Sequence, residues 1–206
     1  MSEMDTLSTT LKSSAQALLL VDVISDFRFE DGAQLFERAR PAMAQLGRLK
    51  KDCLRENIPV IYVNDPPRDR FASVSKLLDQ VKVTDEGRWM LETVGPGSED
   101  SVIIKPQHSG FFRTDLEEQL KKYAAHRVIV AGLTTDICVL FTAHDAFMRG
   151  LKVRVPEDCV AAVKQEYHDQ GISFLSRIAD ADTSPVSGRA LSVNGAGAHR
   201  SADSLW

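Results

Sequence analysis

The sequence predicts one α/β domain with a parallel sheet between layers of helices, and three observations predict it. The chain has 206 residues, a length that suits one domain. Short and nearly continuous apolar runs alternate with longer amphipathic stretches, as strands buried on both faces alternate with crossover helices. No internal repeat is visible. These observations indicate a three-layer, doubly wound α/β fold.

The first third of the chain predicts two strands and a long helix. Residues 17–23 (ALLLVDV) form the first apolar run, and residues 59–63 (PVIYV) form the second. Between them, apolar side chains recur at helical spacing over residues 35–54. Pro41 falls inside this pattern, which predicts a short turn of helix before it and the main helix after it. Residues 64–67 (NDPP) end the second strand, because a helix or a central strand would not tolerate them.

The middle of the chain is less regular than its flanks. Ser73–Val81 predicts a short helix, whereas residues 87–97 contain Trp89 and a Gly-Pro-Gly turn and predict no regular element. Beyond this stretch the alternation resumes, with strands predicted at residues 101–105, 127–131 and 152–155 and helices at residues 116–123, 136–149 and 168–179. Gly150 closes the second of these helices. A sixth, short strand is expected near residues 181–183.

The two ends of the chain differ in composition from the rest. Residues 1–14 are polar and are expected to form a flexible segment before a globular domain at residues 15–184. Residues 185–206 form an extension rich in Gly, Ser and Ala. The extension is interpreted either as flexible or, because Trp206 is an unusual residue to leave in water, as docked on a neighbouring subunit.

Charge and cysteine content exclude several classes of function. The formal net charge is −4, so there is no surplus of positive charge to bind nucleic acid or an anionic membrane. The apolar runs are far shorter than the roughly 20 residues that span a bilayer, and no secretory signal is visible. The three cysteines match no zinc-binding spacing. We therefore expect a cytoplasmic protein with reduced thiols that acts on a small molecule.

Three chemically active side chains fall at the carboxyl ends of predicted strands, where parallel sheets collect functional groups. Asp22 interrupts the first strand, Lys105 ends the third, and the fourth leads into a helix that begins near Cys138. A helix N-terminus and a nearby ammonium both lower the pKa of a thiol. A carboxylate can take the thiol proton and return it to a leaving group, and amides of the turn can stabilise an oxyanion. These groups together predict a nucleophilic cysteine hydrolase.

Each of these residues also has a purely structural interpretation. Cys138 would then be a small buried core residue, as most free cysteines are, but its place at a helix start favours catalysis. Asp22 would be costly to bury without a functional reason, and Lys105 would serve only as its ion-pair partner. Cys53 lies on the apolar face of the long helix and Cys159 follows the fifth strand, so packing is the favoured role of both.

Around these residues the sequence resembles the isochorismatase-like cysteine hydrolases, a superfamily that includes nicotinamidases, N-carbamoylsarcosine amidohydrolase and the isochorismatases. The matching segments are residues 18–27 (LLLVDVISDF), 103–111 (IIKPQHSGF) and 130–161 (VAGLTTDICVLFTAHDAFMRGLKVRVPEDCVA). The resemblance implies that residues 15–184 are a hydrolase domain with a six-stranded, Rossmann-like parallel sheet. It also implies an Asp–Lys–Cys triad in which Asp22 is the general acid and base, Lys105 the polarising cation and Cys138 the nucleophile.

The resemblance further implies a cis peptide bond at Leu133–Thr134, with the amides of Thr134 and Cys138 as the oxyanion hole. Aromatic side chains and one histidine are candidates for the substrate pocket, each with packing or surface exposure as the alternative; these are Phe27, Trp89, His108, Phe111 and Phe112.

The chain departs from relatives that hold a metal. Many nicotinamidases carry histidines after the second strand, whereas this chain has no histidine before His108. We therefore expect no metal and no other cofactor. Retention of Cys138 favours hydrolysis of an amide or ureido C–N bond. Two alternatives remain open, a vinyl ether hydrolase that uses Asp22 as the acid and a non-catalytic binding protein. Relatives are commonly dimers or tetramers, so a homo-oligomer is expected, and the substrate stays undetermined.

Overall fold

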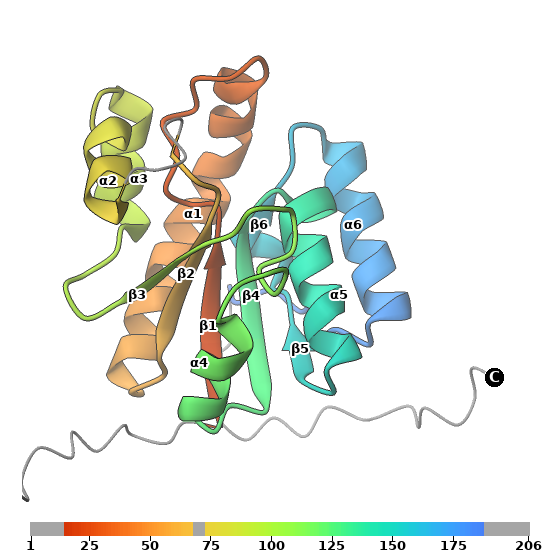
Figure 1. Ribbon diagram of the computed structural model, residues 1–206. Coiled ribbons are helices and arrows are strands. Elements are labelled where there is room, and N and C mark those ends of the chain that lie inside the picture. The colour runs from red at the N-terminus through yellow and green to blue at the C-terminus, as the bar shows by residue number, and fades with distance from the viewer. Residues whose placement is uncertain (1–14, 68–72, 188–206) are drawn as a thin grey trace, which may run out of the picture.

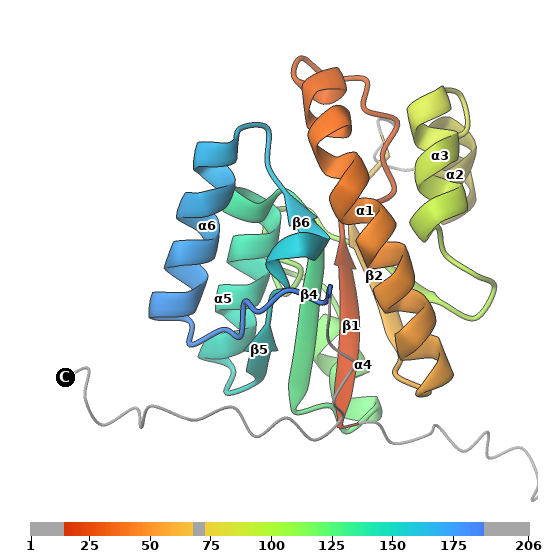
Figure 2. The ribbon, with the colours of Figure 1, turned by 180° about the vertical axis from the view of Figure 1, so that it is seen from behind.

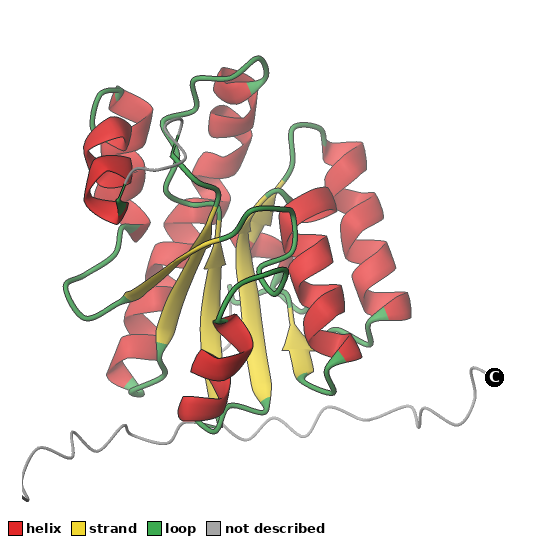
Figure 3. Cartoon of the chain, in the orientation of Figure 1, coloured by secondary structure: helices red, strands yellow, loops and turns green. Residues whose placement is uncertain are grey.

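The structure, a computed structural model, describes residues 15–67 and 73–187 and contains a parallel sheet covered by helices (Figures 1 and 3). The strand order is β3-β2-β1-β4-β5, and β6 pairs with β4. The strands are β1 (Gln16–Val21), β2 (Val60–Asn64), β3 (Ser101–Ile104), β4 (Arg127–Leu133), β5 (Lys152–Arg154) and β6 (Val160–Ala161). All neighbouring pairs are parallel, which confirms the predicted α/β fold with a six-stranded sheet.

The helices are α1 (Gly32–Arg55), α2 (Val74–Val81), α3 (Asp85–Val94), α4 (Leu116–Lys122), α5 (Leu140–Met148) and α6 (Gln165–Ile178). A short π-helix, η1 (Thr135–Val139), precedes α5, and a 3-10 turn, η2 (Glu157–Cys159), precedes β6. Helix α1 crosses one face of the sheet, and α4 and α5 cover the other (Figures 1 and 2). Helices α2 and α3 stand outside α1, with α3 packed against it.

The order of the strands determines where functional groups meet. From β1 the chain moves outward to β2 and β3, and it then returns to place β4 on the other side of β1. This reversal is the switch point at which doubly wound sheets bind ligands, beyond the carboxyl ends of the strands. Every residue of β1 is buried, as the continuous apolar run predicts for a central strand.

Helix α1 is continuous through Pro41, so the prediction of a break at this residue is wrong. A proline inside a helix removes one hydrogen bond and crowds the preceding turn. Pro41 is exposed on the solvent side of α1, whereas the opposite face buries Leu35, Ala39 and Met43 in the core. Packing of that apolar face keeps the helix intact.

Two further expectations are corrected by the structure. Residues within the stretch 87–97, for which no element was predicted, belong to α3, whose start is capped by the Thr84 hydroxyl accepting from the Gly87 amide at 3.0 Å. The sixth strand is β6 rather than residues 181–183, because Asp182 forms only an isolated bridge to Arg154 while β6 pairs with the end of β4.

The described part of the C-terminal extension lies against the domain. Val186 is buried, and the amides of Val186 and Ser187 each donate to the Asp158 carboxylate at 2.8 Å. Trp206 and its expected docking lie outside the described residues. Among the helices that are described, none has the length and apolar character needed to cross a membrane.

Candidate active site

Asp22 lies directly after β1, at the switch point of the sheet. Its amide donates to the Val63 carbonyl at 3.0 Å, which continues the pairing with β2 for one more residue. Its φ of 50° is a left-handed conformation that residues with side chains seldom adopt, and β1 ends here. The Asp22 side chain is only 17% exposed, so its carboxylate needs partners inside the protein.

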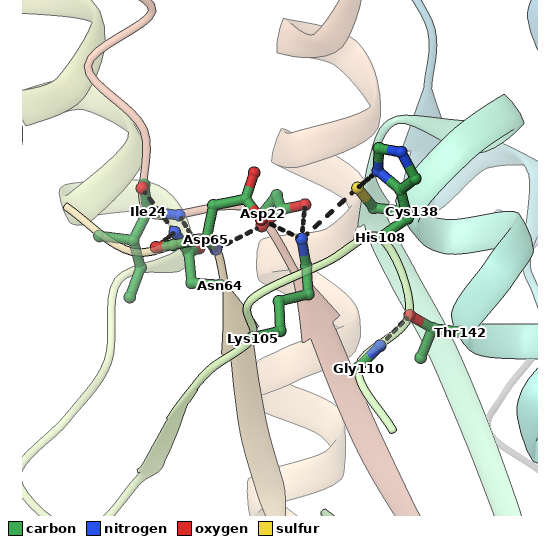
Figure 4. A network of polar contacts seen from close by, with 9 residues as sticks. All are labelled: Asp22, Ile24, Asn64, Asp65, Lys105, His108, Gly110, Cys138 and Thr142. Carbon is green, nitrogen blue, oxygen red and sulfur yellow. Dashed lines mark hydrogen bonds and ion pairs between the residues drawn. The ribbon is translucent and has the colours of Figure 1, made fainter. Parts of the chain in front are cut away.

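Lys105 follows β3 and supplies the central cation of the site (Figure 4). Its side chain is 0% exposed, and its Nζ lies 2.9 Å from Asp22 Oδ2 and 3.5 Å from Cys138 Sγ. The same Nζ also donates to the carboxylate of Asp65. Burial alone would lower the pKa of Lys105, but the negative charge of Asp22 and its other partners raise it above the usual value. The amine is therefore a protonated, buried ammonium with three partners.

Cys138 lies in η1, the π-helix that connects β4 to α5. Turns of this kind are frequent at functional sites. The residue is 8% exposed, and its Sγ lies 3.5 Å from Lys105 Nζ and 3.9 Å from His108 Nδ1. Burial raises the pKa of the thiol, the charge of Asp22 raises it further, and Lys105 offsets only part of this. This direction is opposite to the lowered pKa expected from a helix start, so the thiol needs a base to lose its proton.

Asp22 has the properties of that base. Burial raises its pKa to about 6; Lys105 acts in the opposite direction, and Asp65 adds to the increase. A base whose pKa lies close to neutral pH can both take a proton and return it. The structure thus brings together the three side chains predicted from the strand ends, with the carboxylate and the thiol both in contact with the ammonium.

Asn64 and Asp65 are functional-site residues that the sequence reasoning did not assign. The Asn64 side chain is buried and pairs with both the amide and the carbonyl of Ile24, each at 3.0 Å. The Asp65 amide donates to Asp22 Oδ1 at 2.8 Å. The signal for both residues is their place at the end of a strand, the same position that predicts Asp22 and Lys105.

A cavity of about 480 Å³ opens beside the thiol. Asp22, Thr134 and Cys138 line it, and its wall combines apolar and polar side chains from the loop after β1, from β2 and from α2. These wall residues include Ile24, Ser25, Asp26, Arg28, Phe29, Leu35, Asn64, Asp65, Pro66, Leu77, Gln80, Val81, His108, Leu133 and Ile137. The cavity is large enough for a small molecule and is adjacent to the group that would react.

His108 is the one predicted pocket residue that lines this cavity. Its ring stacks on Phe141 of α5 with centroids 5.7 Å apart. The loop that carries His108 is tied to α5, because the Gly110 amide donates to Thr142 Oγ1 at 2.9 Å (Figure 4). The histidine is therefore held beside the thiol by α5.

The four aromatic residues expected in the pocket do not line this cavity. Phe27 is buried and packs edge-on against Phe36, and Trp89 of α3, which is partly buried, also packs edge-on against Phe36. Phe111 is buried beneath a guanidinium group, and Phe112 is exposed. These four rings pack against other side chains or face solvent. Phe29, in the loop after β1, is instead the phenylalanine that lines the cavity.

Cys53 and Cys159 are 0% exposed and lie in the core, as their packing role predicts. The peptide bond Leu133–Thr134 is cis. Within the described ranges, no group of three or more His, Cys, Asp or Glu residues is arranged to hold a metal ion.

Three comparisons place the chain among known proteins. The family model described as the isochorismatase domain matches residues 16–184. An uncharacterised isochorismatase family protein, YaaI of Bacillus subtilis, is 29% identical over 82% of this chain and 92% of its own length. Nicotinamidase 3 of Arabidopsis thaliana is 26% identical over 80% of this chain and 82% of its own. Among solved structures, N-carbamoylsarcosine amidase of Thermoplasma acidophilum is similar with a TM-score of 0.64 and 28% identity, covering 82% of this chain and 95% of that one.

Proposed function

The chain belongs to the isochorismatase family of hydrolases, and from this premise we propose that it cleaves an amide or ureido C–N bond of a small molecule through a cysteine thioester. The observation that carries the proposal is the buried ammonium of Lys105, in contact with both the Asp22 carboxylate and the Cys138 sulfur. A structural ion pair would not need a thiol beside it that also lines a cavity.

In the proposed reaction, Asp22 takes the proton of Cys138 as the sulfur attacks the substrate carbonyl. Lys105 stabilises the anionic charge as it passes between carboxylate and sulfur. The amides of Thr134 and Cys138 would bind the oxyanion. When the C–N bond breaks, Asp22 gives its proton to the departing amine. The acyl group of the substrate stays bound to the Cys138 sulfur as a thioester. Asp22 then takes a proton from water, the hydroxide attacks the thioester, and the free acid leaves as the sulfur regains a proton.

The choice of a C–N bond rests on the thiol and on two relatives. A sulfur nucleophile is suited to acyl transfer, and Cys138 is placed to use it. The names of the Arabidopsis and Thermoplasma relatives are those of amide hydrolases. Vinyl ether hydrolysis would need Asp22 as an acid but would not need the sulfur.

A panel of small amides, ureides and isochorismate tests the proposal, with ammonia and pyruvate as readouts. We expect ammonia from at least one amide or ureide, and we expect Cys138→Ala to reduce its rate by about 10⁴-fold or more, as the loss of a nucleophile does in other hydrolases. Mass spectrometry of a rapidly quenched reaction should show an acyl adduct on Cys138. Cys159→Ala, which removes a buried thiol elsewhere, should retain activity.

Two results would contradict the proposal. The first is ammonia release that persists undiminished in Cys138→Ala. The second is pyruvate release that requires Asp22 and tolerates Cys138→Ala, which would establish C–O bond cleavage instead.

A further inference from the structure

The active-site charges balance if only the three triad residues are counted with a neutral thiol, but they do not balance once Asp65 is included. The Lys105 ammonium contacts two carboxylates, those of Asp22 and Asp65, together with the Cys138 sulfur (Figure 4). With both carboxylates ionised, the cluster carries one positive and two negative charges. The site therefore holds one more carboxylate than an ion pair with Lys105 requires.

The two carboxylates are not equivalent. The Asp65 side chain is 62% exposed, whereas that of Asp22 is 17% exposed and that of Lys105 is fully buried. Water helps to stabilise the charge of Asp65, while Asp22 depends on the protein for stabilisation. A proton that enters this cluster is therefore bound more favourably by Asp22, because the charged form of Asp22 is stabilised less by water than that of Asp65.

Besides sharing the Lys105 ammonium with Asp22, Asp65 forms a backbone hydrogen bond to it. Its backbone amide donates to Asp22 Oδ1 at 2.8 Å, while Asp22 Oδ2 lies 2.9 Å from Lys105 Nζ. The backbone of Asp65 thus orients the Asp22 carboxylate, and its side chain competes with that carboxylate for the ammonium. A buried aspartate paired alone with a lysine would be held firmly as the anion and would accept a proton poorly.

We propose that Asp65 is a positioning residue that shares the Lys105 ammonium with Asp22 and so keeps Asp22 able to take and return the proton of Cys138. This inference rests on the proposed cysteine chemistry and adds a fourth residue to it. The direction of the electrostatics agrees, since the charge of Asp65 contributes to the raised pKa of both Asp22 and Cys138.

The other charged and titratable groups near Asp22 hold positions different from that of Asp65. Lys105 faces Asp22 from the end of β3 and Cys138 faces it from η1. Beyond the thiol lies His108, and Asp26 and Arg28 line the same cavity. Asp65 is the carboxylate that shares the Lys105 ammonium with Asp22 among the described residues.

Alkylation of Cys138 by iodoacetamide, followed by mass spectrometry across pH, tests the proposal without any substrate. Asp65→Asn removes the charge and retains the backbone amide. We expect the midpoint of the alkylation profile to fall by about 1 pH unit, the size of shift that a neighbouring charge commonly produces. Asp65→Glu should keep the wild-type midpoint. Asp79→Asn, which removes the same charge from an exposed side chain of α2, should also leave it unchanged.

A merely structural role for Asp65 predicts the opposite sign. If Asp65 only anchored Lys105, its loss would free the ammonium from the sulfur and the midpoint would rise. A rise or no change in Asp65→Asn would therefore overturn the proposal. If Asp65→Asn does not fold, NMR titration of labelled aspartate carboxyls in the wild-type protein decides the matter. A titration midpoint for Asp22 at or below the ordinary aspartate value would then overturn it.

Turnover, once a substrate is known, provides a second readout. We expect Asp65→Asn to move the acid limb of the kcat profile to lower pH and to reduce kcat at neutral pH by about 10-fold, within the usual contribution of a tuned base. Because alkylation needs no substrate, a chain that hydrolyses no amide would refute the proposed function and leave the role of Asp65 separately testable.

Discussion

At the residue scale, the Asp22 carboxylate determines how the site responds to pH. Its pKa is raised to about 6, chiefly by burial. In the proposed mechanism the deprotonated form takes the thiol proton, so kcat/KM should increase as pH rises through about 6 and level off above it. A pH–rate profile measures this. Asp22→Asn should be inactive throughout the range, and a profile that falls as pH rises through 6 would contradict the role of a base.

Asn64 is a residue whose contribution should appear in stability. Its side chain satisfies both backbone groups of Ile24 in a buried position. Asn64→Leu leaves a buried donor and a buried acceptor unpaired, so the free energy of unfolding should fall by about 2–4 kcal/mol. Urea denaturation measures the change. A loss below about 0.5 kcal/mol would mean that water replaces the amide and that this loop is not closed at the end of β1.

At the element scale, the approach of β4 to β1 depends on Gly132. Its φ is +122°, and a Cβ at this position would lie 2.1 Å from the Val21 carbonyl oxygen. Gly132→Ala should therefore separate the ends of β1 and β4, lower the free energy of unfolding by about 3 kcal/mol or more, and reduce activity.

Gly150→Ala is the matched control for this clash. Gly150 also has a positive φ, +78°, but no atom lies within 4 Å of its would-be Cβ. This change should cost only about 1–2 kcal/mol of backbone strain. Equal losses in both variants, measured by urea denaturation, would show that the clash at Gly132 contributes nothing.

The elements that were predicted well are those whose pattern depends on local chemistry. The first five strands lie within a residue or two of their predicted positions, and four of them are apolar runs, whereas β5 has the sequence KVR. Pro41 and α3 were mispredicted because local signals, a proline and several glycines, were outweighed by packing against the core. Strand β6 has only two residues, and it exists because the end of β4 is available to pair with it.

The candidate site was predictable where it depends on the position of a residue along the chain, and not where it depends on contacts between side chains. Asp22, Lys105 and Cys138 follow from one rule of sheet topology, which needs only the strand ends. The same rule reaches Asp65, yet nothing local shows that its side chain turns toward Lys105. An aromatic residue such as Trp89 could not be assigned to core or pocket, because its partner Phe36 lies on a helix distant in the sequence.

At the scale of the whole molecule, the three thiols should report different events. Cys53 and Cys159 are 0% exposed, whereas Cys138 borders the cavity. Native protein treated briefly with iodoacetamide should gain one label per chain, located at Cys138, and labels on the other two should require global unfolding. Peptide mass spectrometry with and without urea distinguishes them. Simultaneous labelling of all three in native protein would show that the core opens far more readily than its packing indicates.

The cavity wall has a further consequence for how this protein can be altered. The proposed reacting groups follow strands of the sheet, but part of the wall comes from α2, through Leu77, Gln80 and Val81. Helices α2 and α3 stand outside α1, beside the sheet rather than within it (Figures 1 and 2). Part of the cavity wall is thus carried by a stretch of the chain separate from the strand ends that carry Asp22, Lys105 and Cys138. Exchanging the α2 segment would change which molecules the cavity admits and would leave Asp22, Lys105 and Cys138 in place. The same change is open to natural sequence variation.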